Sequence, residues 1–204
     1  DTYAPITFGG ARFCDMRVWS FFKSVNDDMQ QYYDYVSGHD LSNRMPLWVK
    51  PKSKISNYDL MNFMRDHLEN TPLDMRKDAG AGAFGLPYRW RPLTWTVSDT
   101  ENNREYCNER ATATQQTGFS FIAESRSGFP DVIGGIFWFG VDDASTTVYT
   151  PIYSSITDVP ECFRVGNGDM LSYSSSSAFW LFNLVANLCY LRYDMMSADA
   201  IKVQ

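Results

Sequence analysis

Gly85-Leu-Pro-Tyr-Arg-Trp-Arg-Pro-Leu-Thr-Trp95 leads into a polar stretch that continues as Asn108-Glu-Arg-Ala-Thr-Ala-Thr-Gln-Gln-Thr-Gly-Phe-Ser-Phe121. Within the first segment, Arg89 and Arg91 are two residues apart and therefore share one face of an extended strand. Two cations on one face repel each other unless an anion lies between them. Such an arrangement suits a site that binds a carboxylate or polarises a carbonyl oxygen.

A simpler interpretation of these arginines is pairing with local acids, of which Asp78 and Glu109 are the nearest candidates. Pairing with a carboxylate is a common role of arginine, so the spacing alone does not choose between the two interpretations. We retain Arg91 as a hypothesis for a catalytic contact to an oxyanion or carboxylate. Arg89 is retained as a substrate-binding residue.

Small hydroxyls and amides fill the segment Thr112-Ala-Thr-Gln-Gln-Thr117, which contains no bulky apolar side chain. A buried strand seldom carries so many polar groups, because each needs a hydrogen-bond partner. The segment is typical either of a strand lining a polar pocket or of an exposed strand edge. On the first interpretation, Thr114, Gln115 and Gln116 are pocket residues that hold a substrate.

Helical periodicity marks three segments of the chain. Ser56–Glu69 carries an apolar stripe that includes His67, which we expect to be a core residue with satisfied hydrogen bonds. Phe13–Lys23 is the second, with further helical turns expected through Tyr35. Ser177 is a predicted N-cap for a third helix, which is apolar nearly all round and is expected to pack on two sides.

Strand character dominates the middle of the chain, and each predicted strand is bounded by turn residues. The polar stretch Ser98–Arg104 predicts a hairpin loop, and Asp142-Asp143 predicts a solvated turn. Strands in succession between flanking helices favour an α+β layered fold. The predicted strands are Leu93–Val97, Tyr106–Thr117, Phe119–Glu124, Gly134–Val141 and Thr147–Tyr153.

Composition limits the classes of function. The chain has 204 residues, of which 44% are hydrophobic, and a formal net charge of −6 with scattered positive residues. Nucleic acid is therefore not an expected partner, because no basic stripe exists to neutralise phosphates. No uninterrupted apolar stretch reaches the length of a membrane span. The compartment stays open between cytoplasmic and exported.

Four cysteines occur singly along the chain, at Cys14, Cys107, Cys162 and Cys189. None belongs to a CxxC pair, and no Cys/His spacing is typical of a zinc site. Their apolar and aromatic neighbours indicate inert thiols rather than nucleophiles. The sequence leaves open whether any of them form a disulfide.

The segments Arg44–Pro51, Met64–His67, Gly85–Trp95 and Phe129–Trp138 resemble, in their order and spacing, the cysteine dipeptidase family of the N-terminal-nucleophile hydrolases. The later motifs Thr150–Tyr153, Val159-Pro160 and Ser177–Trp180 extend the similarity over most of the chain. The resemblance implies a four-layer αββα fold. It also implies hydrolysis of dipeptides by a processed N-terminal cysteine, with no metal or organic cofactor.

Asp1 stands where the resemblance would place the nucleophilic cysteine. We therefore expect residues 1–204 to be a single C-terminal portion of a dipeptidase-like domain that is inactive alone. An unpaired sheet edge or apolar face left by a missing segment favours association with that segment or with a second copy. Two alternatives stay open: an amidase for acylated amino acids or bile-acid conjugates, and a non-catalytic module binding carbohydrate or a partner through Trp90 and Trp95.

Overall fold

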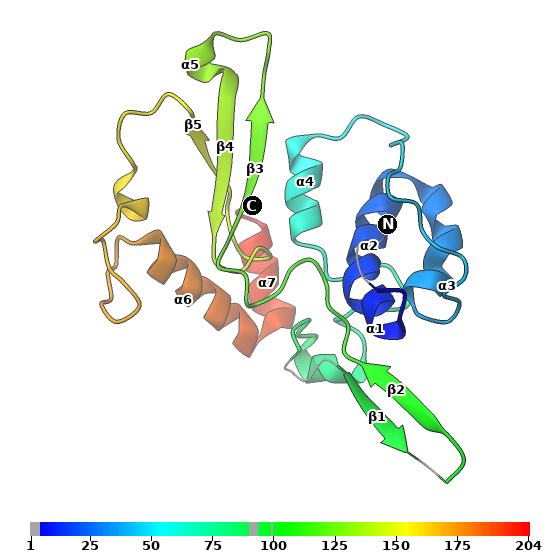
Figure 1. Cartoon of the computed structure of the whole chain (residues 1–204). Helices are drawn as coiled ribbons and strands as arrows, with labels where there is room; N and C mark the ends of the chain where they lie inside the picture. The colour runs from blue at the N-terminus through cyan, green and yellow to red at the C-terminus, as the bar shows by residue number, and fades with distance from the viewer. Residues whose placement is uncertain (1–4, 90–93, 99) are drawn as a thin grey trace. The chain divides into compact units, whose positions relative to one another are not determined.

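The structure, a computed structural model, describes residues 5–89, 94–98 and 100–204 and contains both helices and antiparallel sheets (Figure 1). The predicted α+β class is therefore confirmed at the level of mixed helix and sheet. Two compact units divide the chain between them. The N-terminal unit comprises Asp1–Ser56, Asp66–Gly82 and Pro87–Thr112, and the C-terminal unit comprises Asn57–Arg65, Ala83–Leu86 and Ala113–Gln204.

A succession of short helices opens the N-terminal unit: α1 (Phe8–Gly10), the π-helical turn η1 (Ala11–Asp15), α2 (Met16–Val25), the 3-10 turn η2 (Asp27–Tyr32) and α3 (Tyr33–Val36). The predicted helix over Phe13–Lys23, with further turns through Tyr35, is confirmed. Thr7 caps the first turn, where its hydroxyl accepts from the backbone N–H of Gly10. Asn26 ends α2 in an extended conformation and starts η2, because its side-chain oxygen accepts from the N–H of Asp28.

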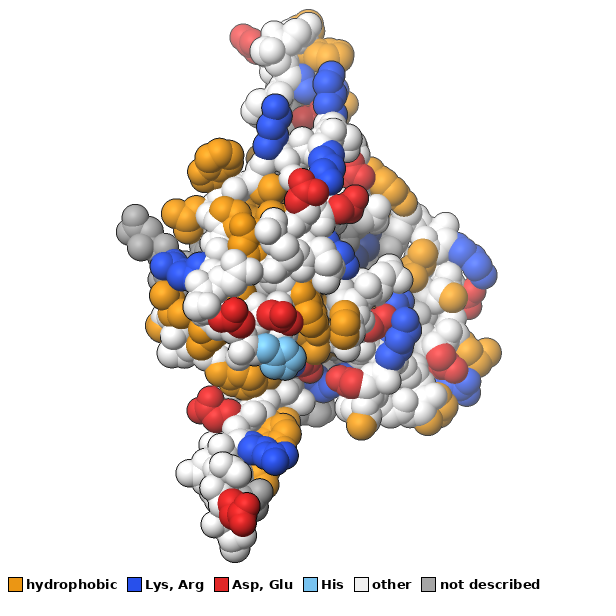
Figure 2. All heavy atoms as spheres, turned by 90° about the vertical axis from the view of Figure 1, so that its right-hand side faces the viewer, with side chains coloured by type: hydrophobic (Ala, Val, Ile, Leu, Met, Phe, Trp, Pro, Cys, Tyr) orange, Lys and Arg blue, Asp and Glu red, His pale blue; other side chains and the backbone are white. Residues whose placement is uncertain are grey.

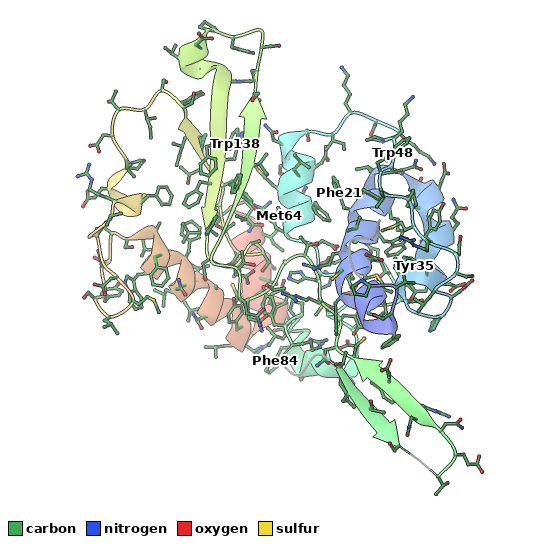
Figure 3. All side chains as sticks on the ribbon, in the orientation of Figure 1. Phe21, Tyr35, Trp48, Met64, Phe84 and Trp138 are labelled. Carbon is green, nitrogen blue, oxygen red and sulfur yellow. The ribbon has the colours of Figure 1, made fainter. Side chains whose placement is uncertain are left out.

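The core of this unit is rich in methionine and aromatic side chains. Trp19 is fully buried, and its indole Nε1 donates to the carbonyl of Met29 at 2.8 Å. Figure 3 labels Tyr35 among the side chains of these helices. A flexible methionine can fill the irregular gaps between rings, which suits a core built from short helices. The buried cluster comprises Met16, Trp19, Met29, Tyr35, Val36, Met45, Leu68, Met75 and Ala111.

The two-stranded hairpin of β1 (Thr94–Ser98) and β2 (Asn103–Cys107) also belongs to the N-terminal unit (Figure 1). Its register pairs Ser98 with Asn103, which confirms the predicted hairpin, although its loop is shorter than the predicted Ser98–Arg104. Trp95 and Tyr106 lie directly opposite each other and stack at 5.9 Å between ring centroids. The predicted strand Tyr106–Thr117, by contrast, is wrong beyond Cys107.

The sheet of the C-terminal unit has the order β3 (Phe119–Ser125), β4 (Gly135–Val141) and β5 (Thr150–Tyr153), all antiparallel. The predicted strands Phe119–Glu124 and Gly134–Val141 are thus confirmed, except that Gly134 ends the short helix α5 (Asp131–Gly134). The predicted strand Thr147–Tyr153 is confirmed only from Thr150 onward. Alternation along β3 separates two faces of different character. One face buries Ser120, Ile122 and Ile136, whereas the opposite face exposes Phe119, Phe121 and Phe137.

Helix α4 (Asn57–Met64) lies beside β3 and is shorter than the predicted Ser56–Glu69 (Figure 1). The side chain of Asn57 donates to Glu124 at 2.6 Å, and Trp138 donates to the same carboxylate at 2.9 Å. Figure 3 labels Met64 on α4 and Trp138 on β4. The chain leaves the helix after Met64, because Leu68 adopts a positive φ and its N–H is held by the Asp66 carboxylate.

At the end of the chain lie the 3-10 turn η4 (Glu161–Phe163), α6 (Ala178–Leu191) and α7 (Tyr193–Ile201). Ser177 occupies the predicted N-cap of α6, although its hydroxyl makes no capping bond. The prediction that this helix packs on two sides is wrong. It buries its small residues Ala178, Ala186 and Cys189, while Phe179, Leu181, Leu184, Val185, Leu188 and Leu191 are exposed.

Candidate functional site

Arg89 forms an ion pair and hydrogen bonds with neighbours in the N-terminal unit. Its guanidinium forms an ion pair with Asp78 and donates to the carbonyl of Met75 at 2.7 Å, and only 7% of its side chain is exposed. Gly80 packs so closely against this guanidinium that an added Cβ would overlap it. The interpretation of local pairing is thus confirmed for Arg89, and its role in binding substrate stays a prediction.

Arg91 and Trp90 lie outside the described residues, so the hypotheses placed on them stay predictions. The other local acid considered for these arginines, Glu109, forms an ion pair with Arg12. Arg12 also donates to the carbonyl of Ser37 at 3.1 Å. Glu109 thus has a partner from a distant segment that the local sequence could not indicate.

Thr114, Gln115 and Gln116 form a turn in the C-terminal unit instead of the predicted strand. The N–H of Thr117 donates to the carbonyl of Thr114 at 3.0 Å, and the hydroxyls of the two threonines lie 3.4 Å apart. Hydroxyl side chains compete with sheet hydrogen bonding by contacting nearby groups of their own segment, which explains the turn. Thr114 and Gln115 are half-buried and Gln116 is exposed.

The four cysteines are all free thiols, which answers the question of a disulfide that the sequence left open. Burial raises the pKa of Cys189, and the neighbouring Asp143 carboxylate raises it further. Burial also raises the pKa of Cys107, an effect that the Arg12 charge only partly offsets. A raised pKa leaves little thiolate at neutral pH, so neither group is an activated nucleophile.

A cluster of ionisable groups follows α4 in the N-terminal unit and was not predicted. Ser20 donates to Asp66 at 2.7 Å, and the backbone N–H of His67 donates to the carboxylate of Glu69 at 2.6 Å. His67 is buried, its Nδ1 lies 3.1 Å from Glu69, and the ring meets the edge of Tyr88, so the prediction of a core histidine is confirmed for its burial and for Nδ1.

The pKa values of the two carboxyl groups in this cluster are shifted in opposite directions. Burial raises the pKa of Asp66 to about 6, and the Glu69 carboxylate adds to the effect. Burial also acts to raise the pKa of Glu69, but hydrogen bonds and charge from His67 outweigh it and lower the pKa to about 2. The cluster can therefore hold or release a proton near pH 6. The sequence contained a signal for this cluster, namely the closely spaced Asp66-His-Leu-Glu69. It was missed because the apolar periodicity assigned the segment to a helix.

Asp142 and Asp143 contradict the predicted solvated turn. Asp143 is fully buried, and its carboxylate accepts from the N–H and hydroxyl of Ser145 and from the hydroxyl of Tyr190, each at 3.0 Å. Burial raises the pKa of Asp142 to about 6, with the Asp143 charge contributing. Asp143 can be buried because the loop after β4 supplies its own donors and α6 supplies Tyr190, whereas Asp142 is half-buried.

Within the described ranges, no three or more His, Cys, Asp and Glu side chains are arranged to hold a metal ion. Across the same part of the chain, no helix is both long and apolar enough to span a membrane. On the face shown in Figure 2, lysine and arginine side chains are interspersed with acids and do not gather into a basic patch. The expectations of a peptide substrate and of self-association stay predictions.

The family profile for peptidase family C69 matches residues 1–204, the whole of the chain. The chain belongs to peptidase family C69. The resemblance inferred from the central segments is thereby confirmed, and the class of activity is that of a hydrolase acting as a peptidase, of the cysteine type. No curated protein and no solved structure matches the chain.

Proposed function

We propose that the protein is a dipeptidase whose nucleophile is a cysteine exposed by processing at the N-terminus of the mature, full-length protein. Membership of peptidase family C69 over the whole chain carries this proposal. The state of the internal thiols supports it, because Cys107 and Cys189 both have raised pKa values and one of them is buried. A nucleophilic thiol requires the opposite environment.

The proposed reaction uses the free α-amino group of that cysteine as the base for its own thiol. The thiolate attacks the carbon of the scissile amide, and the amine leaves as the acyl-enzyme forms. Water then releases the second amino acid and regenerates the thiol. Arg91 would contact the oxyanion or the substrate carboxylate, and Thr114, Gln115 and Gln116 would donate hydrogen bonds to the peptide. No metal or organic cofactor takes part in this proposal.

The four-layer αββα arrangement is part of the same proposal, and the sheet of the C-terminal unit supports it. One face of this sheet is covered near α4, where Asn57 contacts Glu124. The opposite face exposes a cluster of rings, in which Phe121 and Phe137 lie 4.9 Å apart between centroids. A sheet with one helix-covered face and one apolar face suits stacking against a second sheet.

Two alternatives keep some support. An amidase acting on acylated amino acids or bile-acid conjugates would use the same chemistry with a different pocket. A carbohydrate-binding role is favoured by one observation: Trp95 is 43% exposed on β1 and stacks on Tyr106, which presents a flat ring to solvent. Family membership favours the peptidase over this second alternative.

The test is dipeptide hydrolysis by the full-length protein, in the wild type and in the variant Arg91→Ala. Loss of an oxyanion contact is expected to lower kcat/KM by roughly 100- to 1,000-fold. The control is Arg164→Ala, since Arg164 is exposed and pairs with Asp158 at 2.6 Å. Unchanged kcat/KM would remove Arg91 from the site. Absence of dipeptide hydrolysis by the wild type would overturn the proposed function itself.

A further inference from the structure

Arg65 directly follows α4 in the C-terminal unit and points its guanidinium at neutral groups. Its Nη2 donates to the carbonyl of Thr147 at 3.2 Å, and its central carbon lies 5.4 Å from the ring centroid of Tyr149. Nη1 reaches the side-chain oxygen of Asn62 only at 3.5 Å, which is a weak hydrogen bond. The hydroxyl of Tyr149 is itself bonded to Ser120 at 2.8 Å.

The charge of Arg65 is not compensated by a carboxylate. In the part of the chain that the structure describes, no acidic oxygen lies within the 4.0 Å that defines an ion pair with this guanidinium, and its Nε is buried with no hydrogen-bond partner. Burial lowers the pKa of Arg65, although Tyr149 and Tyr58 oppose the effect. Burying a cation without a counter-ion is costly, so such a group calls for an anionic partner.

The hydrogen bond from Arg65 is not needed to satisfy the Thr147 carbonyl. The Thr147 carbonyl already accepts a hydrogen bond from the side chain of Gln204 at 3.1 Å, so it has a partner without Arg65. Among the described residues, the guanidinium also makes no hydrogen bond to the last carbonyls of α4, where a basic side chain would stabilise the end of a helix. The contact with the Tyr149 ring instead orients the planar guanidinium group before any ligand binds.

We propose that Arg65 binds the C-terminal carboxylate of the peptide substrate, an inference that rests on the proposed peptidase function. A planar guanidinium matches the two oxygens of a carboxylate, and pre-orientation on an aromatic ring lowers the entropy lost on binding. The chain as a whole carries a charge of −6, so an anionic substrate needs a local cation. Arg89 does not offer this free charge, because Asp78 neutralises it.

This assignment makes Arg65 a specificity-determining residue. Peptides with a free carboxylate would be preferred over peptides whose C-terminus is amidated, since an amide brings no charge to the guanidinium. The effect should fall on substrate selection rather than on the attacking thiol. The expected signature is therefore a change in the ratio of two kcat/KM values and not a general loss of activity.

The experiment compares alanyl-alanine with alanyl-alaninamide as substrates of the full-length protein. Arg65→Gln is expected to lower kcat/KM for the dipeptide by roughly 10- to 100-fold, the strength of a hydrogen bond to a charged group, while the amide is cleaved as before. The matched control is Arg126→Gln. Arg126 also lies over a ring in the C-terminal unit, at 4.5 Å from the Phe129 centroid, but it has Glu124 as a carboxylate partner at 3.8 Å.

Calorimetric binding of N-methylated alanyl-alanine, which resists hydrolysis, gives a second measurement independent of turnover. Weaker binding by Arg65→Gln, with unchanged binding by Arg126→Gln, supports the inference. An unchanged ratio of the two substrates, or an equal loss for both, overturns it and leaves the dipeptidase standing. A wild-type protein that binds the probe through Arg65 but cleaves neither substrate would overturn the proposed function and leave the carboxylate site standing.

Discussion

The two units of this chain bury different kinds of side chain. The N-terminal unit surrounds Trp19 with methionines and rings, and its arginines Arg12 and Arg89 each pair with a carboxylate. In the C-terminal unit, the fully buried positions include Asp143 and Thr147, while Phe119 is 60% exposed. The largest fully buried side chains of the first unit are thus mostly apolar, although Trp48 on its surface is 78% exposed. Those of the second unit are polar, and its sheet and α6 present apolar side chains to solvent.

This difference separates the region that we expect to dominate stability from groups that are still able to contact a second surface or a ligand. A dense apolar core supplies the hydrophobic contribution to folding, and paired charges around it add little that a ligand could use. Exposed rings and an uncompensated cation such as Arg65 are instead the groups with capacity for a second surface or a substrate. We therefore expect core substitutions to be most costly in the N-terminal unit.

The largest expected effect is that of Trp19→Ala. Removing a fully buried indole that also donates to Met29 is expected to cost about 3–5 kcal/mol of unfolding free energy. The matched variant is Phe121→Ala on the exposed face of the C-terminal sheet, where about 0.5–1 kcal/mol is expected. Urea denaturation measures both. Equal losses would contradict the contrast between the two units.

A smaller effect is expected from the titration of Asp66. Its folded pKa of about 6 lies above the ordinary value of 3.8, so the folded state keeps a proton that the unfolded state has lost. The unfolding free energy should therefore fall as the pH rises from about 4 to 6, by about 3 kcal/mol. The lowered pKa of Glu69 acts below this window, where stability is lost as the pH falls from about 4.5 to 2.

Asp66→Asn keeps the shape of the protonated acid and should remove this part of the pH dependence. Chemical denaturation at pH 4, 5, 6 and 7 would show a flatter profile in the variant. Asp142→Asn provides the comparison in the C-terminal unit, because burial raises the pKa of Asp142 to about 6 as well. If the Asp66→Asn profile keeps the slope of the wild type, the buried proton is not located on that residue.

The smallest effect concerns the hairpin, an exposed part of the otherwise well-packed unit. Trp95→Ala removes the stack on Tyr106 and is expected to cost about 0.5–1 kcal/mol. Val97→Ala, two residues along the same strand and also exposed, is the control with an expected change under about 0.5 kcal/mol. A loss for Trp95→Ala as large as that for Trp19→Ala would show that the ring is covered in the native protein.

Much of the local structure was predictable because it depends on neighbouring residues. The turn residues of Ser98–Arg104 predicted the hairpin, and the Ser177 N-cap predicted the start of α6. Predictions were wrong where side chains bond outside the expected pattern. Helix α4 ends early because Asp66 holds the N–H of Leu68, and the strand expected over Tyr106–Thr117 gives way to a turn.

The amino-acid pattern was sufficient for the family and the mixed helix-and-sheet class, since motif order, periodicity and turn chemistry are all properties of short segments. The sequence alone did not show which charged side chains form ion pairs, because this depends on the folded structure. Glu109 reaches Arg12 across 97 positions, and Arg65 meets the carbonyl of Thr147 across 82. Burial and pairing depend on groups that are distant along the chain, so the burial of Asp143 and the surroundings of Arg65 became visible only in three dimensions.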